Sequence, residues 1–339
     1  MKLILSTSNI MGAGSSIRRS PGTKSNTELV SSLRANFAEH SDAGEAQTAS
    51  STGNVANSAS GDSEQTNGSE PAVQHYPPWT RKIGDTLEVP ALEFSHSALQ
   101  EEREQYDITV KLFYLPGGTS SSRDAQTREA LDLVMKQLHV PSIDLLILSF
   151  PGIYFDEQED CPDKLSTRGP VEAEPEPLER QYDAWNTAEA LHKEGTVARL
   201  GVAEFGKERL ETFLNKVRVK PSVDQINLRD CCSVPKELMA LAKSQSVDLL
   251  VHNDCSNILP RGTTRDLLGP IQDGARVLPE PAKTGDKRKS AHLDDDQNEL
   301  AVRGLGGEVQ PQWVVKYTAV VKNRGVVENK GYFAVANLT

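Results

Sequence analysis

The feature that most constrains the fold of this chain is a regular alternation of short apolar strands with amphipathic helices. Residues 108–113 (ITVKLF) predict a half-buried strand, and apolar side chains three and four apart in residues 124–138 predict a helix with one apolar face. Residues 143–148 (IDLLIL) are almost continuously apolar, as in a parallel strand covered on both faces. This strand–helix–strand order predicts parallel α/β architecture.

The same unit recurs along the rest of the chain. The remaining predicted elements are helices at residues 182–192, 207–216, 236–243 and 313–322, and strands at residues 3–6, 92–94, 199–203, 223–228, 247–252 and 325–327. No glycine-rich dinucleotide-binding sequence follows any strand, which favours closure over an open doubly wound sheet. We therefore predict a single (β/α)8 TIM barrel domain over residues 1–339.

Three segments interrupt the alternation, and their compositions do not favour packing. Residues 41–70 contain no aromatic side chain and no Lys or Arg, and residues 279–298 combine Pro and Gly with a basic and an acidic run. Residues 155–180 hold nine acids, three bases and four prolines. We predict disordered insertions at 41–70 and 279–298 and an acidic loop at 155–180.

Charge and cysteine usage argue against several classes of protein. The chain carries 48 acids and 37 bases, and its net charge of −11 does not favour binding to nucleic acid or to anionic lipid. Its four cysteines lack the spacing of a zinc site, so no metal site is expected. With no run of 18 apolar residues and no signal-like segment, we expect a cytoplasmic protein without membrane contact.

Several segments match one known family in the order in which that family carries them. They are Val110-Lys111-Leu112-Phe113 and residues 144–151, 185–205 and 221–228. Together they resemble the aldo-keto reductases, which implies a reductase-type barrel. In that family a tyrosine acid, tuned by a lysine and an aspartate, works with a histidine beside a nicotinamide cofactor.

Departures from the family pattern point away from reduction. Lys111 stands at the position of the family lysine, but Ser149 stands where the histidine is expected. Around residues 92–96 no aspartate is followed five residues later by a tyrosine. Ala203 and Glu204 replace the Ser-Asn pair that binds the carboxamide, and Glu204 brings a carboxylate to that position.

Two alternatives that keep the cofactor stay open. An NADPH-dependent reductase would combine Lys111 with an unrecognised tyrosine, for which Tyr106 and Tyr114 are the candidates. A pseudo-enzyme would bind NADP without turnover, and the resemblance offers Gln225 and Lys330 as its candidate contacts. The leading prediction requires no cofactor and leaves vestigial NADP binding as an alternative.

A second resemblance covers most of the predicted barrel. It rests on Asn227-Leu228, Cys231-Cys232 and residues 238–243, 251–254 and 320–332. These segments resemble the regulatory (modifier) subunits of glutamate–cysteine ligase, and the long insertions suggest a fungal-type member. Such subunits are non-catalytic and pair with a separate catalytic subunit, improving glutamate use and relieving feedback inhibition by glutathione. The resemblance therefore implies a heterodimer with that catalytic subunit.

Candidate partner or redox residues lie near the predicted strand ends. Cys231, Cys232 and Cys255 are candidates for a mixed disulfide with the catalytic subunit, and inert buried thiols are the simpler alternative. His252 is the last residue of a predicted strand, where barrels carry functional groups, although such a residue also caps turns. Lys111 is either a relic of a reductase site or a strand lysine held by a carboxylate. We expect none of these residues to catalyse a reaction.

Overall fold

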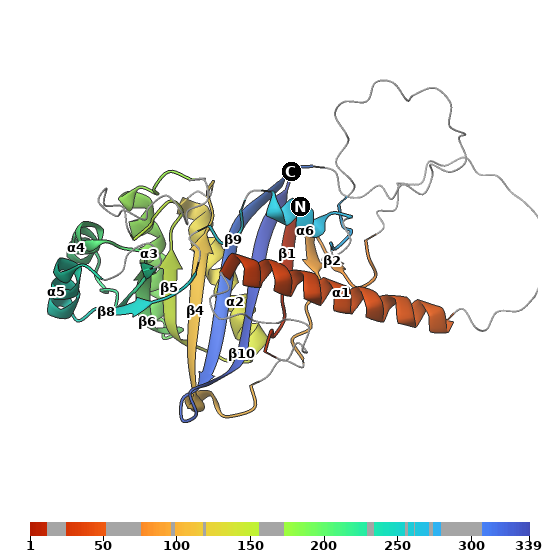
Figure 1. Ribbon diagram of the computed structural model, residues 1–339, viewed down its shortest axis with the longest axis horizontal. Helices are drawn as coiled ribbons and strands as arrows, with labels where there is room; N and C mark the ends of the chain where they lie inside the picture. The colour runs from red at the N-terminus through yellow and green to blue at the C-terminus, as the bar shows by residue number, and fades with distance from the viewer. Residues whose placement is uncertain are drawn as a thin grey trace, which may run out of the picture.

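The structure, a computed structural model, describes residues 1–11, 25–51, 76–95, 99–117, 120–155, 173–228, 234–254, 257–260, 262–270, 274–278 and 307–339. Its strands are β1 (Lys2–Ser6), β2 (Arg81–Ile83), β3 (Thr86–Val89), β4 (Tyr106–Tyr114), β5 (Ile143–Ser149), β6 (Val197–Ala203), β7 (Val223–Ile226), β8 (Asp248–Val251), β9 (Val309–Val321) and β10 (Val326–Leu338). Its helices are α1 (Ser25–Ser51), α2 (Ser120–Leu138), α3 (Leu178–Lys193), α4 (Lys207–Lys216), α5 (Lys236–Gln245) and α6 (Thr263–Leu268), with a 3-10 turn at Arg103–Gln105. The strands form one mixed sheet in the order β2-β3-β1-β10-β9-β4-β5-β6-β7-β8, a row that Figure 1 shows from β8 at one end to β2 at the other.

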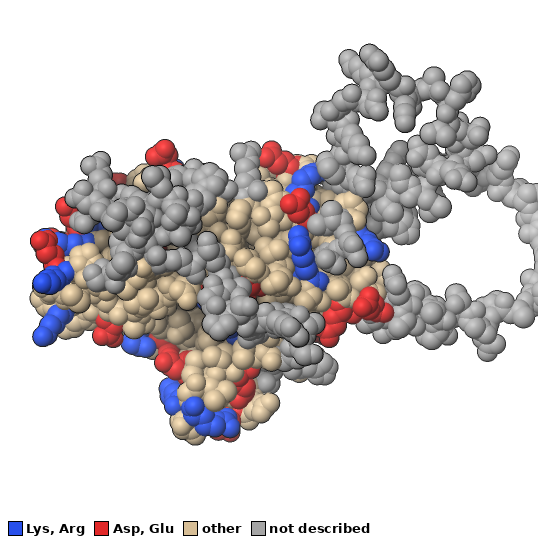
Figure 2. All heavy atoms as spheres, viewed as in Figure 1, with Lys and Arg blue, Asp and Glu red and all other residues tan. Residues whose placement is uncertain are grey.

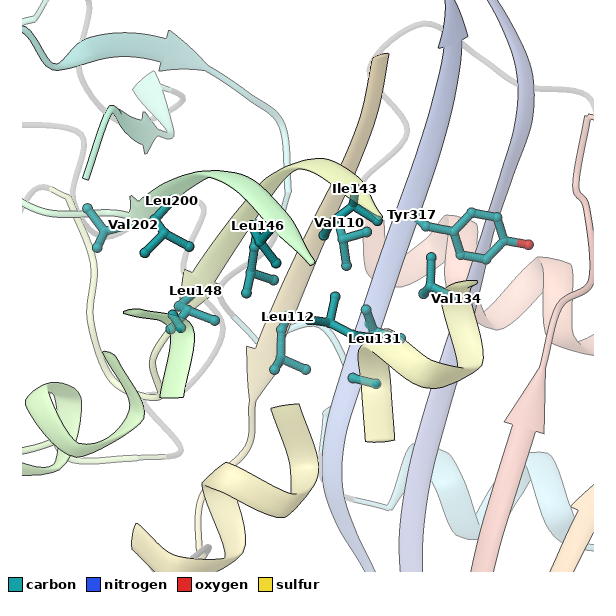
Figure 3. Packing of buried hydrophobic residues seen from close by; sticks show 14 of the residues in the cluster. Val110, Leu112, Leu131, Val134, Ile143, Leu146, Leu148, Leu200, Val202 and Tyr317 are labelled. Atoms are coloured by element: carbon teal, nitrogen blue, oxygen red, sulfur yellow. The ribbon is translucent and has the colours of Figure 1, made fainter. Parts of the chain in front are cut away.

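The predicted alternation is confirmed in the half of the sheet from β4 to β8. These five strands pair in parallel in chain order, and helices α2 to α5 connect them. Leu131 and Val134 of α2 pack against Val110 and Leu112 of β4, as Figure 3 shows. Alternate side chains of a strand point to opposite faces, so a strand that is covered on both faces needs a continuous apolar run, as the sequence has in β4 and β5.

Helix α1 covers the opposite face at the other half of the sheet. Its Leu29, Leu33 and Phe37 are buried in a second apolar cluster with residues of β1, β3, β10 and α6. Adjacent residues of β10 separate the two layers, since Tyr332 belongs to the α1 cluster and Phe333 to the α2 cluster. We call the face that carries Tyr332 and α1 the inner face.

Strands β9 and β10 correct the prediction for the C-terminal region. Residues 313–322, predicted to be a helix, form most of β9, and the strand predicted at 325–327 continues to Leu338. β9 pairs antiparallel with both β10 and β4. The helix prediction was wrong because the sequence WVVKYTAVV is rich in β-branched and aromatic residues, which favour a strand buried between two neighbours.

The amino-terminal strands also differ from the prediction. Residues 92–94 are not a strand, and β3 instead pairs in parallel with β1 while β2 pairs with β3. Within the described ranges, the strand pairings form a series with β2 and β8 at its ends rather than a ring of eight parallel strands. The α/β fold class is confirmed, with this mixed arrangement.

Only part of the first predicted insertion falls on described residues. Residues 41–51 are helical, because α1 runs to Ser51, and this corrects the expectation of disorder there. Three of these eleven residues are Ala, which has the highest helix propensity. Residues 52–70 and the predicted loop 279–298 lie outside the described residues.

The acidic loop predicted at residues 155–180 is packed at its end. Residues 156–172 lie outside the described residues, but α3 already begins at Leu178. Glu176 is buried and forms an ion pair with the buried Arg123 of α2. The expectation that this segment does not pack was wrong here, because a single buried cation gives one of its many acids a partner.

Two further observations concern surfaces. On the face shown in Figure 2, acidic and basic side chains of the described residues are interspersed, so neither sign dominates that face. Among the helices that the structure describes, none is both long enough and apolar enough to cross a bilayer.

Candidate functional site

The inner face carries a buried group of charged side chains where strands β4 and β9 meet. Lys111 of β4, which is 3% exposed, stands in register with Lys316 of β9. Its Nζ donates to Asp254 Oδ2 at 3.1 Å and to Gln225 Oε1 at 3.0 Å. Lys316 Nζ donates to the other oxygen of Asp254 at 2.7 Å. One carboxylate, placed just after β8, therefore bridges two lysines.

Burial and charge set the protonation of this bridge. Burial lowers the pKa of Lys111, although the negative charges of Asp254 and Glu204 act in the opposite direction. Burial also acts to raise the pKa of Asp254, but the positive charges of Lys111 and Lys316 outweigh it and hold that pKa well below its usual range. Asp254 is thus a carboxylate at any ordinary pH.

His252 and Glu204 extend the group toward β6. His252 Nε2 lies 2.7 Å from Glu204 Oε1, and His252 Nδ1 accepts a hydrogen bond from the Asp254 N–H at 3.0 Å. Glu204 has φ +67°, a left-handed conformation that is unusual for a non-glycine residue, and its other oxygen accepts from the Phe155 N–H at 3.1 Å. The charge network, as we name it, consists of Lys111, Glu204, Gln225, His252, Asp254 and Lys316.

In the charge network Lys111 is held by a carboxylate, as one of the two alternatives for this residue expects. The aspartate that the reductase pattern lacks near β3 is replaced by Asp254, which lies 143 residues from Lys111 in the sequence. Gln225, a candidate nicotinamide contact, accepts a hydrogen bond from Lys111 instead. Ser149 of β5 is buried and stands in register with Phe113, one alternation beyond Lys111 on the same face.

Neither candidate tyrosine is placed to work with Lys111. Tyr106 and Tyr114 lie five and three residues from Lys111 on β4, an odd spacing that puts them on the opposite face. The Tyr106 hydroxyl donates to Glu328 at 2.6 Å, and the Tyr114 hydroxyl bonds to Thr127 at 2.6 Å. Burial raises the pKa of Tyr114 to about 12, which makes it a poor proton donor.

Lys330, the other candidate NADP contact, pairs with helix α1. On β10, its Nζ is 2.6 Å from Glu28 Oε1 of α1, and the Tyr332 hydroxyl donates to the same oxygen at 2.7 Å. Burial acts to raise the pKa of Glu28, but these two hydrogen bonds more than compensate and lower it. Since Gln225 and Lys330 are both engaged within the protein, the described residues do not fit a nicotinamide cofactor bound in the family's manner.

A pocket of about 340 Å³ opens nearby, at the C-terminal ends of β4 and β5. Its volume suits a small ligand. The described residues of its lining include no Lys or Arg and one acid; they include Tyr114, Tyr154, Asn257, Glu308, Gln310 and Gln312. This lining gives a dinucleotide phosphate no cationic partner.

The remaining candidate residues cannot be placed. Cys231, Cys232 and Cys255 lie outside the described residues. Within the described ranges, no group of three or more His, Cys, Asp or Glu side chains has the geometry of a metal site.

Asp224 of β7 is a buried acid that sequence reasoning did not single out, and its environment leads to a prediction. Its Oδ1 accepts from the Phe205 N–H at 3.3 Å, and its Oδ2 has no hydrogen-bond partner. Burial, reinforced by the charge of Glu204, raises the pKa of Asp224 well above its usual range. The folded protein therefore holds this proton more tightly than the unfolded chain, and stability falls as pH rises above about 4.

Asp224→Asn removes that titration while keeping the acceptor for Phe205. The stability of the variant relative to wild type is expected to be about 1–3 kcal/mol more favourable at pH 8 than at pH 4. Urea unfolding at both pH values measures the difference. A difference that stays constant between them would show that folding does not raise the pKa of Asp224.

The sequence of this chain is similar to those of several known proteins. The model of the "Aldo/keto reductase family" matches residues 88–257, from the end of β3 to just beyond β8. The human protein named glutamate–cysteine ligase regulatory subunit is 28% identical over 260 residues, which cover 77% of each chain. A putative glutamate–cysteine ligase regulatory subunit of Schizosaccharomyces pombe is 26% identical over 246 residues, covering 71% of this chain and 75% of the yeast protein.

Among solved structures, the aldose reductase of Giardia lamblia overlaps with 44% of this chain and 46% of its own, with 25% identity and a TM-score of 0.32. That overlap is partial. The resemblance to the regulatory subunits is confirmed by the human and yeast relatives. Because the family model matches half of its length, the chain belongs to the aldo/keto reductase family.

Proposed function

We propose that this chain acts in the cytoplasm as a regulatory subunit of glutamate–cysteine ligase, binding the catalytic subunit and performing no reduction itself. The human relative that carries this name matches 77% of its own length and 77% of this chain. The observation that carries the proposal is the state of Lys111. Its ammonium group is held by Asp254 and Gln225, and no tyrosine hydroxyl in the described part of the chain is hydrogen-bonded to it.

The chemistry of carbonyl reduction supports the same proposal. Reduction needs an acid that protonates the developing alkoxide and a group that orients the carbonyl. Lys111 would tune such an acid, but the tyrosines on its strand face the other way. Ser149 at the histidine position offers a hydroxyl that is a far weaker acid than an imidazolium. A bridged, buried ion pair of this kind holds strands β4 and β9 to the segment after β8.

A regulatory subunit acts by binding two states of its partner with different affinity. We infer that this chain favours the state of the catalytic subunit that binds glutamate better and responds less to glutathione, as in the proteins it resembles. Such coupling is typically worth a factor of about 5–150 in affinity. No cofactor is required for it.

Co-expression with a glutamate–cysteine ligase catalytic subunit tests the proposal. We expect a stable heterodimer and a KM for glutamate several-fold below that of the catalytic subunit alone, because the complex favours the substrate-binding state. Steady-state kinetics and analytical ultracentrifugation measure both effects. Absence of a complex together with an unchanged KM would refute the proposal.

Titration of the isolated chain with NADPH separates the alternatives. We expect no change in intrinsic fluorescence and no reduction of an aldehyde such as methylglyoxal. Binding without turnover would favour the pseudo-enzyme, and turnover would favour a reductase.

A further inference from the structure

Strand β8 ends the sheet with an exposed apolar edge. Leu250 and Val251 of β8 are 41% and 60% exposed, and Met239 of the adjacent helix α5 is 45% exposed. β8 and α5 lie together at one end of the molecule in Figure 1. Half of the exposed large apolar side chains among the described residues therefore gather at this end.

The backbone of β8 is paired on one side. The Asp248 N–H donates to Ser222 O at 2.8 Å and the His252 N–H donates to Ile226 O at 3.1 Å, both toward β7. Because alternate residues of a parallel strand present their N–H and C=O groups to opposite sides, Leu249 and Val251 direct theirs away from β7. In the part of the chain that the structure describes, no strand pairs with that side.

The two ends of the sheet are protected differently. Natural edge strands are commonly short and carry Lys or Arg, which discourages pairing with other chains. β2, at the far end, fits this description, since it has three residues and begins Arg81-Lys82. β8 carries an exposed charge at its first residue, Asp248, and its other three residues are two leucines and a valine. Its sequence does not prevent pairing.

The position of this edge in the fold adds a second argument. The chain has five consecutive parallel strands from β4 to β8, and the match to the reductase family ends at residue 257, just after β8. In a closed (β/α)8 barrel, a further parallel strand would pair with this edge. The edge thus has the backbone geometry of a strand that accepts a neighbour.

We propose that an extended segment of the catalytic subunit pairs with the outer edge of β8 as an added strand. This inference rests on the proposed function, because it names the surface by which the regulatory subunit engages its partner. Addition of a strand supplies main-chain hydrogen bonds to Leu249 and Val251, while the side chains set specificity. Leu250 and Val251 point to opposite faces of the sheet, so the added segment must carry apolar side chains on both of its faces.

A second copy of this chain is a poorer occupant. Four residues of strand span only about 13 Å, whereas each side of a stable interface typically has roughly 20–30 residues. A pair of β8 edges would have little else to hold it together. A catalytic subunit that already contacts this chain elsewhere can add the strand as one part of a larger interface.

Substitution of the edge tests the proposal in the full-length complex. Leu250→Lys combined with Val251→Lys is expected to weaken binding of the catalytic subunit by roughly tenfold or more, because two apolar contacts become buried charges. Val251→Pro removes one outward N–H without touching the bonds to β7 and is expected to act in the same direction. Ile83→Lys is the matched control, since Ile83 is 56% exposed on the opposite edge strand. The affinity of this variant for the catalytic subunit should equal that of wild type.

Hydrogen exchange on the unmodified complex gives an answer that does not depend on any variant. The Leu249 and Val251 amides are expected to exchange more slowly when the catalytic subunit is bound. Unchanged exchange together with unchanged affinity of the lysine variant would overturn the edge proposal, even though the complex forms. Failure of wild type to bind would instead refute the proposed function. A homodimer of the isolated chain that Val251→Lys abolishes would identify a second copy as the occupant.

Discussion

Asp254→Asn is expected to destabilise the fold by about 3–5 kcal/mol, because it leaves the ammonium groups of the buried Lys111 and the partly buried Lys316 without their shared counter-charge. Lys111→Met should cost less, since Asp254 then keeps Lys316 as its partner. Urea unfolding of the three proteins gives the order of stability. Asp132→Asn provides the control, because Asp132 pairs with Lys136 on the exposed surface of α2 and should shift the unfolding midpoint little.

The stability of the Asp254→Asn variant is expected to depend on pH. Burial already lowers the pKa of Lys111, and the loss of the Asp254 charge lowers it further. At pH values between the lowered pKa of Lys111 in the folded variant and the unfolded pKa near 10.4, the unfolded chain binds more protons than the folded protein. The stability of the variant therefore rises with pH in this range. Part of the loss in Asp254→Asn should therefore be recovered near pH 10. If Asp254→Asn unfolds no more easily than Lys111→Met, the charge network does not stabilise the fold in this way.

Arg123→Met is expected to destabilise the fold by about as much as Asp254→Asn does. The guanidinium of Arg123 pairs with Glu176 and lies 4.4 Å from the centroid of the Tyr114 ring, and both charged side chains are buried. Without Arg123, Glu176 loses its cation inside the protein, a change that costs about 3–5 kcal/mol when the remaining group stays charged. Burial raises the pKa of Glu176 even with Arg123 present, so part of this cost can be relieved by protonation.

A double variant separates pairing from burial. Arg123→Met combined with Glu176→Gln removes both charges and should recover most of the stability lost by Arg123→Met alone. Thermal unfolding of the two single variants and the double variant gives the coupling between the two side chains. If the losses simply add, the ion pair contributes nothing beyond the packing of each side chain.

Strong local signals made half of the fold predictable. The runs ITVKLF and IDLLIL correspond to β4 and β5, because a strand buried on both faces needs continuous apolar sequence. In β9, by contrast, Trp313, Tyr317 and Val320 or Val321 also have helical spacing, so periodicity favoured the wrong element. What decides the strand is its two neighbours, β4 and β10, and they are distant in sequence.

Sequence predicted the residues of the candidate site that lie on strands with strong local signals. Lys111 and Ser149 could be assigned because they lie on strands whose order matches a known family. The role of Asp254 could not, because it depends on the segment after β8 returning to β4, and its sequence neighbours carry no signal for that contact. Lys316 escaped notice because the helix predicted around it would not have faced Lys111.

The C-terminal hairpin also constrains the order in which this chain can fold during synthesis. β10 lies between β1 and β9, and β9 lies between β10 and β4, so in the described sheet the hairpin of β9 and β10 links the amino-terminal strands to the parallel half. The units from β4 to β8 can assemble as they leave the ribosome, whereas β1 waits for a partner more than 300 residues away. Throughout elongation, one side of β1 is therefore open to incorrect pairing with other strands.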